Sequence, residues 1–307
     1  MTVIVRDFRP DDAAAVVRIR RATEPYAVTT EAALHFAVRS ANPASKYRML
    51  VAEYDGEVVG TSHVGLVHDS SEPGVARVNP HVHPDHTGKG VGSAILRTAE
   101  EHLAAEGATT LFTWVSDVPA GRAFAERRGY SPLRTAHFQR LDLTGAALPE
   151  PPELPAGFTA ATAADFADNP RSVFEADAEA TSDEPSDIGT DFDDYEDWLN
   201  HTWRHPCLDH GLSTLVVAPD GRIAAFAAAH TDGATTYLSA MTGTLREHRG
   251  RGLAKAAKVD SLRRARAAGY RDAFTNNDAR NEPMLAVNTW FGYEICASEV
   301  RHVRELT

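Results

Sequence analysis

His86-Thr87-Gly88-Lys89-Gly90-Val91-Gly92 is a glycine-rich stretch that recurs later in the chain as His248-Arg249-Gly250-Arg251-Gly252-Leu253-Ala254. Gly250 follows Gly88 by 162 positions, and a second matching pair, Gly129-Tyr130 and Gly292-Tyr293, is 163 positions apart. Two motifs that repeat at nearly one spacing indicate an internal duplication. Asp165 follows Asp12 by only 153 positions, so the second copy carries extra residues before its glycine stretch.

Prolines mark the junction between the two copies. Residues 143–157 contain four of them, Pro149, Pro151, Pro152 and Pro155. Proline fixes φ and lacks an N–H donor, so this composition is typical of an extended linker. The sequence therefore predicts an N-terminal domain over residues 1–147, a proline-rich linker over 148–156 and a C-terminal domain over 157–307.

Each copy shows the same order of expected elements. Branched and aromatic residues predict a strand pair over residues 49–67 and again over 214–229, with turns at Asp55-Gly56 and Asp220-Gly221. A further strand, at 76–83 or 235–245, runs into the glycine stretch, and a helix of apolar period follows it. A terminal strand, at 137–143 or 299–304, is expected to close each copy. Strands that alternate with helices, together with hairpins, predict a mixed α/β fold.

The glycine stretch has the features of an anion site. The first N–H groups of a helix have no intrahelical partner, and the helix dipole favours negative charge there. Glycine lets the backbone approach phosphate oxygens and adopt positive φ. Neither stretch has the spacing of a P-loop or of a dinucleotide-binding fingerprint. The pattern therefore predicts a phosphate-binding turn of another kind in each copy.

Both stretches resemble the signature of the GNAT superfamily of N-acetyltransferases. That signature is Gln or Arg, two variable residues, Gly, one variable residue, and Gly or Ala. Residues 249–254 match it in full, and residues 87–92 match it except at Thr87. The resemblance implies two GNAT-like α/β (α+β) domains, each with a mixed, mostly antiparallel sheet whose fourth and fifth strands splay apart between flanking helices. The two-copy organisation resembles that of tandem members such as mycothiol synthase.

The resemblance also implies acetyl-CoA, or another acyl-CoA, as the co-substrate. The glycine turn would wrap its pyrophosphate, and backbone N–H groups around Val82 and Thr244 would hold its thioester oxygen. The cofactor-binding residues expected on this basis are Val82, Thr87, Gly88, Lys89, Gly90, Val91 and Gly92 in the first copy, and Thr244, Leu245, Arg249, Gly250, Arg251, Gly252, Leu253, Ala254 and Asn281 in the second. Asn281 precedes a helix, where the ordinary role of asparagine is an N-cap.

The chain departs from the family at one catalytic position. Many members place a tyrosine four residues before the glycine of the Gly-Tyr pair, where it can protonate the departing thiolate. Here Ala125 and Asn288 stand at that position. A thiol with a pKa of about 8.5 gives a fair leaving group, so the loss need not abolish transfer. The resemblance makes Asn288 a candidate for contact with CoA and for catalysis.

The string His81-Val82-His83-Pro84-Asp85-His86 raises a competing interpretation. It resembles the zinc-binding signature of the metallo-β-lactamase superfamily, and histidine and carboxylate are suitable zinc ligands. The corresponding residues 243–248 of the second copy keep only one acid and one histidine, so we expect no metal. In the transferase interpretation, two histidines that alternate on a strand share a face bordering the acyl site. His81 or His83 is then expected to act as the base.

Negative charge is concentrated in one segment. The net charge is −12, and residues 172–203 contain eleven acidic residues and no Lys or Arg. Nucleic-acid binding requires the opposite sign, so no nucleic acid is expected as a partner. The segment is either a solvated loop, with an amphipathic helix over 193–203, or an attractor for a cationic amine. No apolar run is long enough for a membrane span, and two cysteines are too few for a disulfide framework. A cytoplasmic protein is expected, with a homodimer left open.

These features predict acyl transfer from acyl-CoA to a primary amine of a small, cationic molecule. An alkylamine must lose a proton before it attacks, and no carboxylate on residues 235–245 offers a base in the second copy. We nevertheless expect the second copy to catalyse, because it holds the full signature, and the first copy to bind acyl-CoA weakly or to serve as structure. Two alternatives stay open: an acyl-CoA sensor or partly inactive tandem protein, and a zinc hydrolase.

Overall fold

The computed structural model describes residues 2–145, 147–189 and 194–306. The chain divides into two compact units. Unit 1 contains the chain up to Ala136, a short segment that begins at Asp187, and the chain from Ala297 onward. Unit 2 contains most of the residues between His137 and Cys296.

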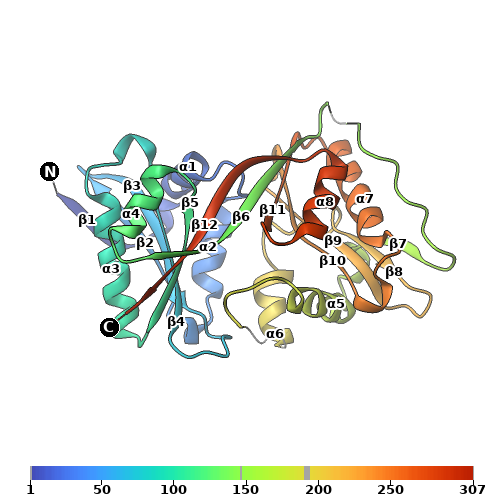
Figure 1. The fold of residues 1–307 in the computed structure, drawn as a ribbon, viewed down its shortest axis with the longest axis horizontal. Helices are drawn as coiled ribbons and strands as arrows, with labels where there is room; N and C mark the ends of the chain where they lie inside the picture. Colours follow the sequence, from blue (N-terminus) through green and yellow to red (C-terminus); the bar gives the residue numbers. More distant parts are fainter. Residues whose placement is uncertain (1, 146, 190–193, 307) are drawn as a thin grey trace. The chain divides into compact units, whose positions relative to one another are not determined.

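Unit 1 is a mixed sheet with helices along it (Figure 1). Its strand order is β1-β2-β3-β4-β5-β12, and all neighbours are antiparallel except the parallel pair β4–β5. The strands are β1 (Val3–Asp7), β2 (Arg48–Tyr54), β3 (Glu57–Leu66), β4 (Val75–Val82), β5 (Thr110–Ser116) and β12 (Glu294–Glu305), which belongs to unit 1 from Ala297 onward. The helices are α1 (Ala13–Thr23), α2 (Glu31–Ser40), α3 (Val91–Ala105) and α4 (Pro119–Glu126).

Alternation along β2 separates two helix layers in unit 1. Leu50 belongs to the apolar cluster that includes Leu96 and Leu103 of α3. Its neighbours Met49 and Val51 belong to the cluster formed with α1 and α2. Successive side chains of a strand point to opposite faces. Helix α3 therefore covers one face of the sheet, and α1 with α2 covers the other.

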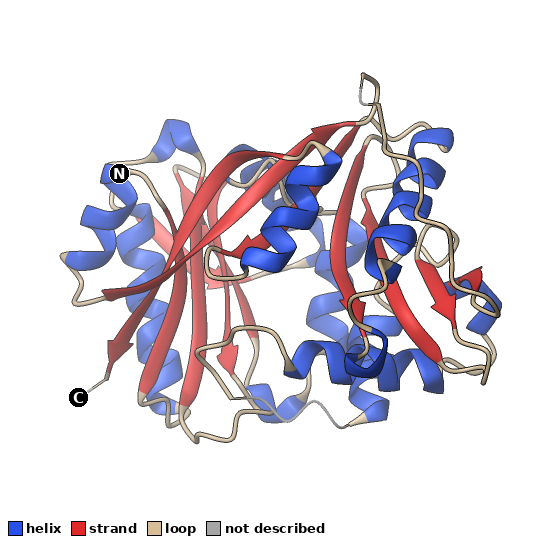
Figure 2. Ribbon diagram, turned by 45° about the vertical axis from the view of Figure 1, so that its right-hand side comes forward, coloured by secondary structure: helices blue, strands red, loops and turns tan. Residues whose placement is uncertain are grey.

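Unit 2 repeats this architecture (Figure 2). Its strand order is β6-β11-β10-β9-β8-β7, with the parallel pair at β10–β11. The strands are β6 (Ser131–Asp142), which belongs to unit 2 from His137 onward, β7 (Thr159–Thr162), β8 (Thr214–Val217), β9 (Ile223–Thr231), β10 (Thr236–Thr244) and β11 (Asp272–Asp278). The helices are α5 (Arg171–Ser182), α6 (Tyr195–Trp198), α7 (Leu253–Ala267) and α8 (Glu282–Phe291). The predicted fold class, with mixed and mostly antiparallel sheets, is confirmed.

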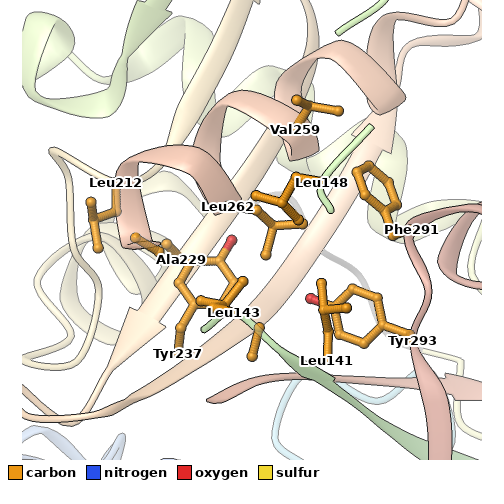
Figure 3. Packing of buried hydrophobic residues seen from close by; sticks show 12 residues of the cluster. Leu141, Leu143, Leu148, Leu212, Ala229, Tyr237, Val259, Leu262, Phe291 and Tyr293 are labelled. Carbon is orange, nitrogen blue, oxygen red and sulfur yellow. The ribbon is translucent and has the colours of Figure 1, made fainter. Parts of the chain in front are cut away.

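The main core of unit 2 lies between α7 and the sheet (Figure 3). Val259 and Leu262 of α7 belong to one apolar cluster with Tyr237 of β10, Leu141 and Leu143. Val259 and Leu262 are three positions apart and so lie on one helix face, which is the apolar period that predicted this helix. Burial of each such side chain contributes about 1.5–3 kcal/mol relative to exposure.

The last strands of the two copies are exchanged. β12 ends the second copy in the sequence, yet it pairs with β5 of unit 1, with Glu299 opposite Ser116. β6 ends the first copy, yet it neighbours β11 of unit 2, where the N–H of Leu143 donates to the carbonyl of Arg271 at 2.8 Å. The expectation that a terminal strand closes its own copy is therefore wrong.

The exchange has a simple physical origin. A strand is recognised by its backbone and by the alternation of its side chains, and the two copies offer similar strands and similar sheet edges. Alternation therefore predicts both strands without specifying which sheet each of them joins. As a consequence, the compact units differ from the domains expected over residues 1–147 and 157–307, and the proline-rich segment belongs to unit 2.

Much of the acidic segment is folded rather than a solvated loop. The indole Nε1 of Trp198 donates to the buried carboxylate of Asp177 at 2.8 Å, which ties α6 to α5. The amphipathic helix expected over 193–203 is present from Tyr195 and continues as a π-helical turn to Trp203, while residue 193 lies outside the described residues. Across the described parts of the chain, no helix combines the length and apolar character of a membrane span.

Candidate functional site

The first glycine turn, residues 87–92, leads from β4 toward α3 as expected. Gly90 is the N-cap of α3 with a φ of +84°, and Gly88 has a φ of +75°. Residues that carry a Cβ atom seldom adopt this region. A Cβ atom placed on either glycine would meet nothing within 4 Å. The backbone at the start of α3 is therefore accessible to a ligand, as phosphate binding requires.

β4 and β5 separate before the turn. Their parallel pairing covers only three residues of each strand. Beyond it, Oδ1 of Asn79 accepts a hydrogen bond from the backbone N–H of Trp114 at 3.0 Å, so this side chain bridges the gap. On the other edge of β4 the N–H of His83 donates to the carbonyl of Val59 at 2.8 Å. Alternation in an antiparallel pair then directs the N–H of Val82 into the gap, where a thioester oxygen was expected.

A cavity of about 710 Å³ in unit 1 is lined both by the glycine turn and by the separated strands. This volume is within the range of small-molecule sites, about 300–1,000 Å³. The residues expected to bind the cofactor that line it are Val82, Thr87, Gly88, Gly90, Val91 and Gly92. Lys89 lies outside the lining, and its Nζ is 5.3 Å from the centroid of the Tyr54 ring.

Two arginines, Arg127 and Arg128, also line the cavity. The Arg128 guanidinium lies over the ring of Phe124, 3.7 Å from its centroid, and donates to the carbonyl of Phe124 at 2.9 Å. It also donates to Oγ of Ser93 in the first turn of α3. Cations beside an open helix N-terminus suit a polyanion such as CoA. The residues of this wall therefore fit the expected co-substrate.

Three titratable side chains, Glu24, His81 and Glu299, line the same cavity. Nε2 of His81 lies 3.8 Å from Oε1 of Glu24, and Glu24 forms an ion pair of 2.6 Å with Arg20. The hydroxyl of Tyr26 donates to Oε1 of Glu299 at 2.9 Å. These side chains come from the end of α1, from β4 and from the exchanged strand β12.

Burial dominates the electrostatics of these three groups. It raises the pKa of Glu24 in spite of Arg20, and together with the charge of Glu24 it raises the pKa of Glu299 to about 7. Burial lowers the pKa of His81 well below 6.5, and the charges of Arg20 and His63 lower it further. At neutral pH, His81 is therefore uncharged, and the pKa of Glu299 lies close to neutrality.

The histidines of the string lie in different surroundings. His83 is the N-cap of a short 3-10 turn (Pro84–His86) and lies outside the cavity lining, unlike His81. The ring of His86 stands edge-on to that of Tyr54. Within the described residues, no group of three or more His, Cys, Asp or Glu side chains could hold a metal ion. That the protein binds no zinc stays a prediction.

The second glycine turn, residues 249–254, has the same backbone conformation as the first, but other residues of unit 2 contact it. Gly250 and Gly252 have φ values of +77° and +76°. Arg249 forms an ion pair with Asp183, and Arg246 contacts the same carboxylate at 2.6 Å. Hydrogen bonds from the two arginines lower the pKa of Asp183 to about 2.

The proline-rich segment lies against the same turn. Pro152 is 3.7 Å from the position that a Cβ atom of Gly252 would take. Leu253, the first residue of α7, packs in a cluster with Leu154. Leu245 is likewise buried in an apolar cluster of unit 2. Contacts within the protein thus occupy several residues expected to bind the cofactor in the second copy.

A polar network replaces part of the cavity wall in unit 2. Leu96, Ala125 and Tyr130 line the cavity of unit 1, and at the repeat spacing they correspond to Lys258, Asn288 and Tyr293. Lys258 and Asn288 are both 0% exposed. Nζ of Lys258 donates to Oδ1 of Asn288 at 2.7 Å.

Asn288 makes further bonds within this network, and Asn281 caps a helix. Nδ2 of Asn288 donates to Oε1 of Gln139 at 2.9 Å and to Oδ1 of Asn277 at 2.6 Å. Asn281 is the N-cap of α8, and its side chain accepts from the N–H of Met284 at 3.4 Å. Both asparagines, expected at a CoA site, are thus engaged with other parts of unit 2.

Sequence reasoning missed Glu24 and Glu299. Glu24 is the C-cap of α1, a position with no signature of its own. Glu299 was visible as an acid in an expected strand, but its place in unit 1 depends on the strand exchange. Arg127 and Arg128 precede the Gly-Tyr pair of the first copy, and that proximity was the one available signal.

The chain is similar to known acetyltransferases, and one family model matches it in two places. The model of the acetyltransferase (GNAT) family matches residues 13–130 and again residues 173–293, which confirms the duplication. Mycothiol acetyltransferase of Nocardiopsis dassonvillei is 27% identical over 293 residues, covering 86% of this chain and 84% of the relative. Mycothiol acetyltransferase of Frankia casuarinae is 28% identical over 251 residues, covering 78% and 69%.

Solved structures share the fold along the whole chain. A tandem GNAT protein from the clavulanic acid biosynthesis pathway aligns with a TM-score of 0.73 at 22% identity, covering 99% of this chain and 98% of that one. A GCN5-related N-acetyltransferase from Sphaerobacter thermophilus aligns with a TM-score of 0.69 at 24% identity, covering 99% and 95%.

Proposed function

The chain belongs to the acetyltransferase (GNAT) family and is an acetyl-CoA-dependent N-acetyltransferase, and from this premise we propose that its acetyl transfer to a primary amine of a small molecule takes place in the cavity of unit 1. One observation carries the proposal. A single cavity is bounded by the glycine turn, by Val82 at the strand gap, and by Glu24 and Glu299. In this cavity the glycine turn can bind phosphate, the N–H of Val82 can polarise the thioester, and Glu24 or Glu299 can transfer a proton.

The chain's residues divide the work of this reaction. The N–H groups of the first glycine turn, with Arg127 and Arg128, hold the phosphates and so orient the distant thioester. The N–H of Val82 stabilises the oxyanion that develops on the thioester oxygen. The amine nitrogen bonds to the carbonyl carbon, the C–S bond breaks, and the thiolate leaves. Ala125 stands at the family's tyrosine position, so the thiolate receives its proton from the attacking nitrogen.

The proposal reverses the division of labour that the motifs predict. The second copy has the full signature, but Asp183 engages Arg246 and Arg249, and Pro152 lies against Gly252. The first copy lacks the signature residue at Thr87, yet a Cβ atom on Gly88 or Gly90 would meet nothing within 4 Å. We therefore assign acetyl transfer to unit 1 and a structural role to unit 2. The chain of unit 2 leads into β12, the strand that pairs with β5 of unit 1.

A matched pair of variants tests this assignment. Gly90→Asp and Gly252→Asp place the same carboxylate at the same position of the two turns. We expect calorimetry to give one acetyl-CoA site per chain in the wild type, no binding in Gly90→Asp, and unchanged binding in Gly252→Asp. Release of free CoA thiol should follow the same order with any amine that reacts. The opposite order would move the reaction to unit 2, and binding without any turnover would favour an acyl-CoA sensor.

A screen of amines with acetyl-CoA identifies the acceptor of the acetyl group. The relatives named mycothiol acetyltransferase make amines related to mycothiol a first group to test, alongside amino sugars and simple aliphatic amines. Wild-type protein is incubated with acetyl-CoA and each amine, and the appearance of CoA thiol and of the acetylated product is measured. Amides formed with at least one primary amine, and lost in Gly90→Asp, are the expected result.

A further inference from the structure

One end of the unit 1 cavity carries more negative charge than its cations neutralise. Arg20 pairs with Glu24 at 2.6 Å, so these two charges offset each other. His81 is uncharged at neutral pH because it is buried near Arg20. Glu299 is held by Tyr26, a neutral hydroxyl. When Glu299 is ionised, the group as a whole therefore carries one uncompensated negative charge beside the acyl site.

We infer that Glu299 is the base that takes a proton from a cationic amine acceptor, so the acceptor class is small molecules with an ammonium group. The inference rests on the proposed function and adds to it the catalytic residue and the charge of the substrate. The relevant geometry is the placement of a carboxylate from β12 on the wall of the cavity that also presents Val82.

An unpaired atom of His81 also points to a ligand in this place. Nδ1 of His81 lies 3.3 Å from Oγ1 of Thr23, but its buried Nε2 has no hydrogen-bond partner among the described residues. A buried polar atom without a partner is destabilising, because it has lost its hydrogen bonds to water, so such atoms are seldom left unpaired. A polar substrate in the cavity would supply the missing partner.

Glu299 suits proton transfer better than its two neighbours. Glu24 is committed to its ion pair with Arg20, and protonation would break that pair. The lowered pKa of His81 makes it a weak base toward an ammonium group. Glu299 has a pKa of about 7, set by burial and by Glu24, with Tyr26 and Arg20 acting in the opposite direction. General base catalysis is most efficient when the pKa is near the working pH.

The proton balance of the step is as follows. The ammonium group gives one proton to the Glu299 carboxylate and becomes a neutral amine. The amine attacks the thioester carbon, the C–S bond breaks, and the proton that the nitrogen then loses goes to the thiolate. The products are the amide and CoA thiol. Glu299 returns its proton to water before the next turnover.

The strand exchange gives this carboxylate to unit 1 alone. In unit 1 the N–H of Leu306 donates to the carbonyl of Thr109, and in unit 2 the N–H of Leu143 donates to that of Arg271, at the same position of the repeat. Glu299 of β12 lies seven residues before Leu306, and Ala136 of β6 lies seven residues before Leu143, so these two residues correspond. The second copy of the fold therefore has alanine where the first has its base.

The test is the pH profile of kcat/KM, measured by CoA-thiol release with the more active of ethanolamine and D-glucosamine. In the wild type we expect kcat/KM to rise with pH through about 7 as Glu299 ionises. Glu299→Gln should lower kcat/KM at pH 8 by about 100-fold or more, and should remove this rising limb. Tyr26→Phe removes a hydrogen bond that favours the carboxylate, so it should move the limb to higher pH.

Two controls separate catalysis from structure. Glu305→Gln makes the same chemical change at an exposed position of the same strand and should leave rate and profile unchanged. Calorimetry should give all variants the affinity of the wild type for acetyl-CoA. If the wild type acetylates an amine and Glu299→Gln keeps its rate and limb, the inference is overturned and the proposed function stands. If no amine of the screen is acetylated, the proposed function fails and the inference falls with it.

Discussion

Oε1 of Glu299 accepts a hydrogen bond of 2.9 Å from the hydroxyl of Tyr26, although the two residues are 273 positions apart in the chain. Tyr26 follows the first helix of the chain, and Glu299 lies on its last strand. The bond forms because β12 pairs with β5 rather than with the strands of its own sequence copy. The cavity of unit 1 is therefore complete only when the C-terminal strand has joined its sheet.

Glu299 should make stability depend on pH. Its pKa is raised from 4.5 to about 7, first by burial and then by Glu24. Between these values the folded chain holds more protons than the unfolded chain, so the free energy of unfolding falls as the pH rises through this window. Glu299→Gln should remove this slope, with a relative gain on the order of 1–3 kcal/mol at pH 8 compared with pH 4.5. Urea denaturation at both pH values measures it.

Glu305→Gln is the matched control for that measurement. Glu305 is an exposed carboxylate on β12 and should leave the slope of the wild type in place. An equal slope in Glu299→Gln and in the wild type would mean that Glu299 ionises as freely in the folded chain as in the unfolded one.

Trp198 should stabilise unit 2 through its indole N–H. The N–H donates to Oδ2 of Asp177 at 2.8 Å, and burial raises the pKa of this carboxyl while the bond from Trp198 lowers it. Trp198→Phe keeps the aromatic packing but removes the donor, so we expect a loss of about 1–3 kcal/mol in the free energy of unfolding. Trp290→Phe, at a side chain 40% exposed, should change stability much less. Equal effects in urea denaturation would contradict this role of the bond.

Metal analysis of the purified protein checks the remaining alternative. His81, His83 and His86 belong to a string that resembles a zinc signature, but His83 caps a turn and only His81 and His86 line the cavity. We expect elemental analysis to find no stoichiometric zinc, and chelator treatment to leave acetyl transfer unchanged. One or two tightly bound zinc ions that disappear in His81→Ala would support a hydrolase instead.

The features that could be predicted from sequence are those set by neighbouring residues. Glycines at positive φ before an apolar helix define each phosphate-type turn, and the repeat of that pattern gives the duplication. Gly88 and Gly90 have the conformation that this reasoning requires. The partner of each terminal strand could not be predicted, because β6 and β12 are similar strands offered to similar sheet edges.

The candidate site shows the same division. The expected turn of the first copy and His81 line the cavity, but Glu24 and Glu299 meet there only through tertiary packing. In the second copy the complete signature at Arg249 favoured a binding site. The motif could not indicate that Asp183, from the acidic segment, would bind that arginine. A short motif specifies a backbone shape, and the contacts that occupy it depend on distant residues.

Lys258 provides the most direct measure of how unit 2 differs from unit 1. Its ammonium group is fully buried against Asn288 and lies over the ring of Tyr293, where the cavity of unit 1 has Leu96. Burial lowers its pKa from 10.5 to about 7. Between these values the unfolded chain holds more protons than the folded one, so this lysine makes the free energy of unfolding rise as the pH increases from about 7.

Lys258→Met replaces the amine by an apolar side chain of similar length and should abolish that rise, which for one proton is at most about 1.4 kcal/mol per pH unit. Urea denaturation at pH 7 and pH 9 gives the slope for the wild type, for Lys258→Met and for Lys255→Met. Lys255 is three residues earlier on the same helix and is partly exposed, so its variant should keep the slope of the wild type.

At pH 7 the Lys258→Met variant also leaves Oδ1 of Asn288 without its lysine donor, a cost of about 1–3 kcal/mol that does not depend on pH. The change of slope, rather than the change at one pH, therefore decides. A slope that survives in Lys258→Met would show that this amine is already neutralised by a partner or reached by solvent.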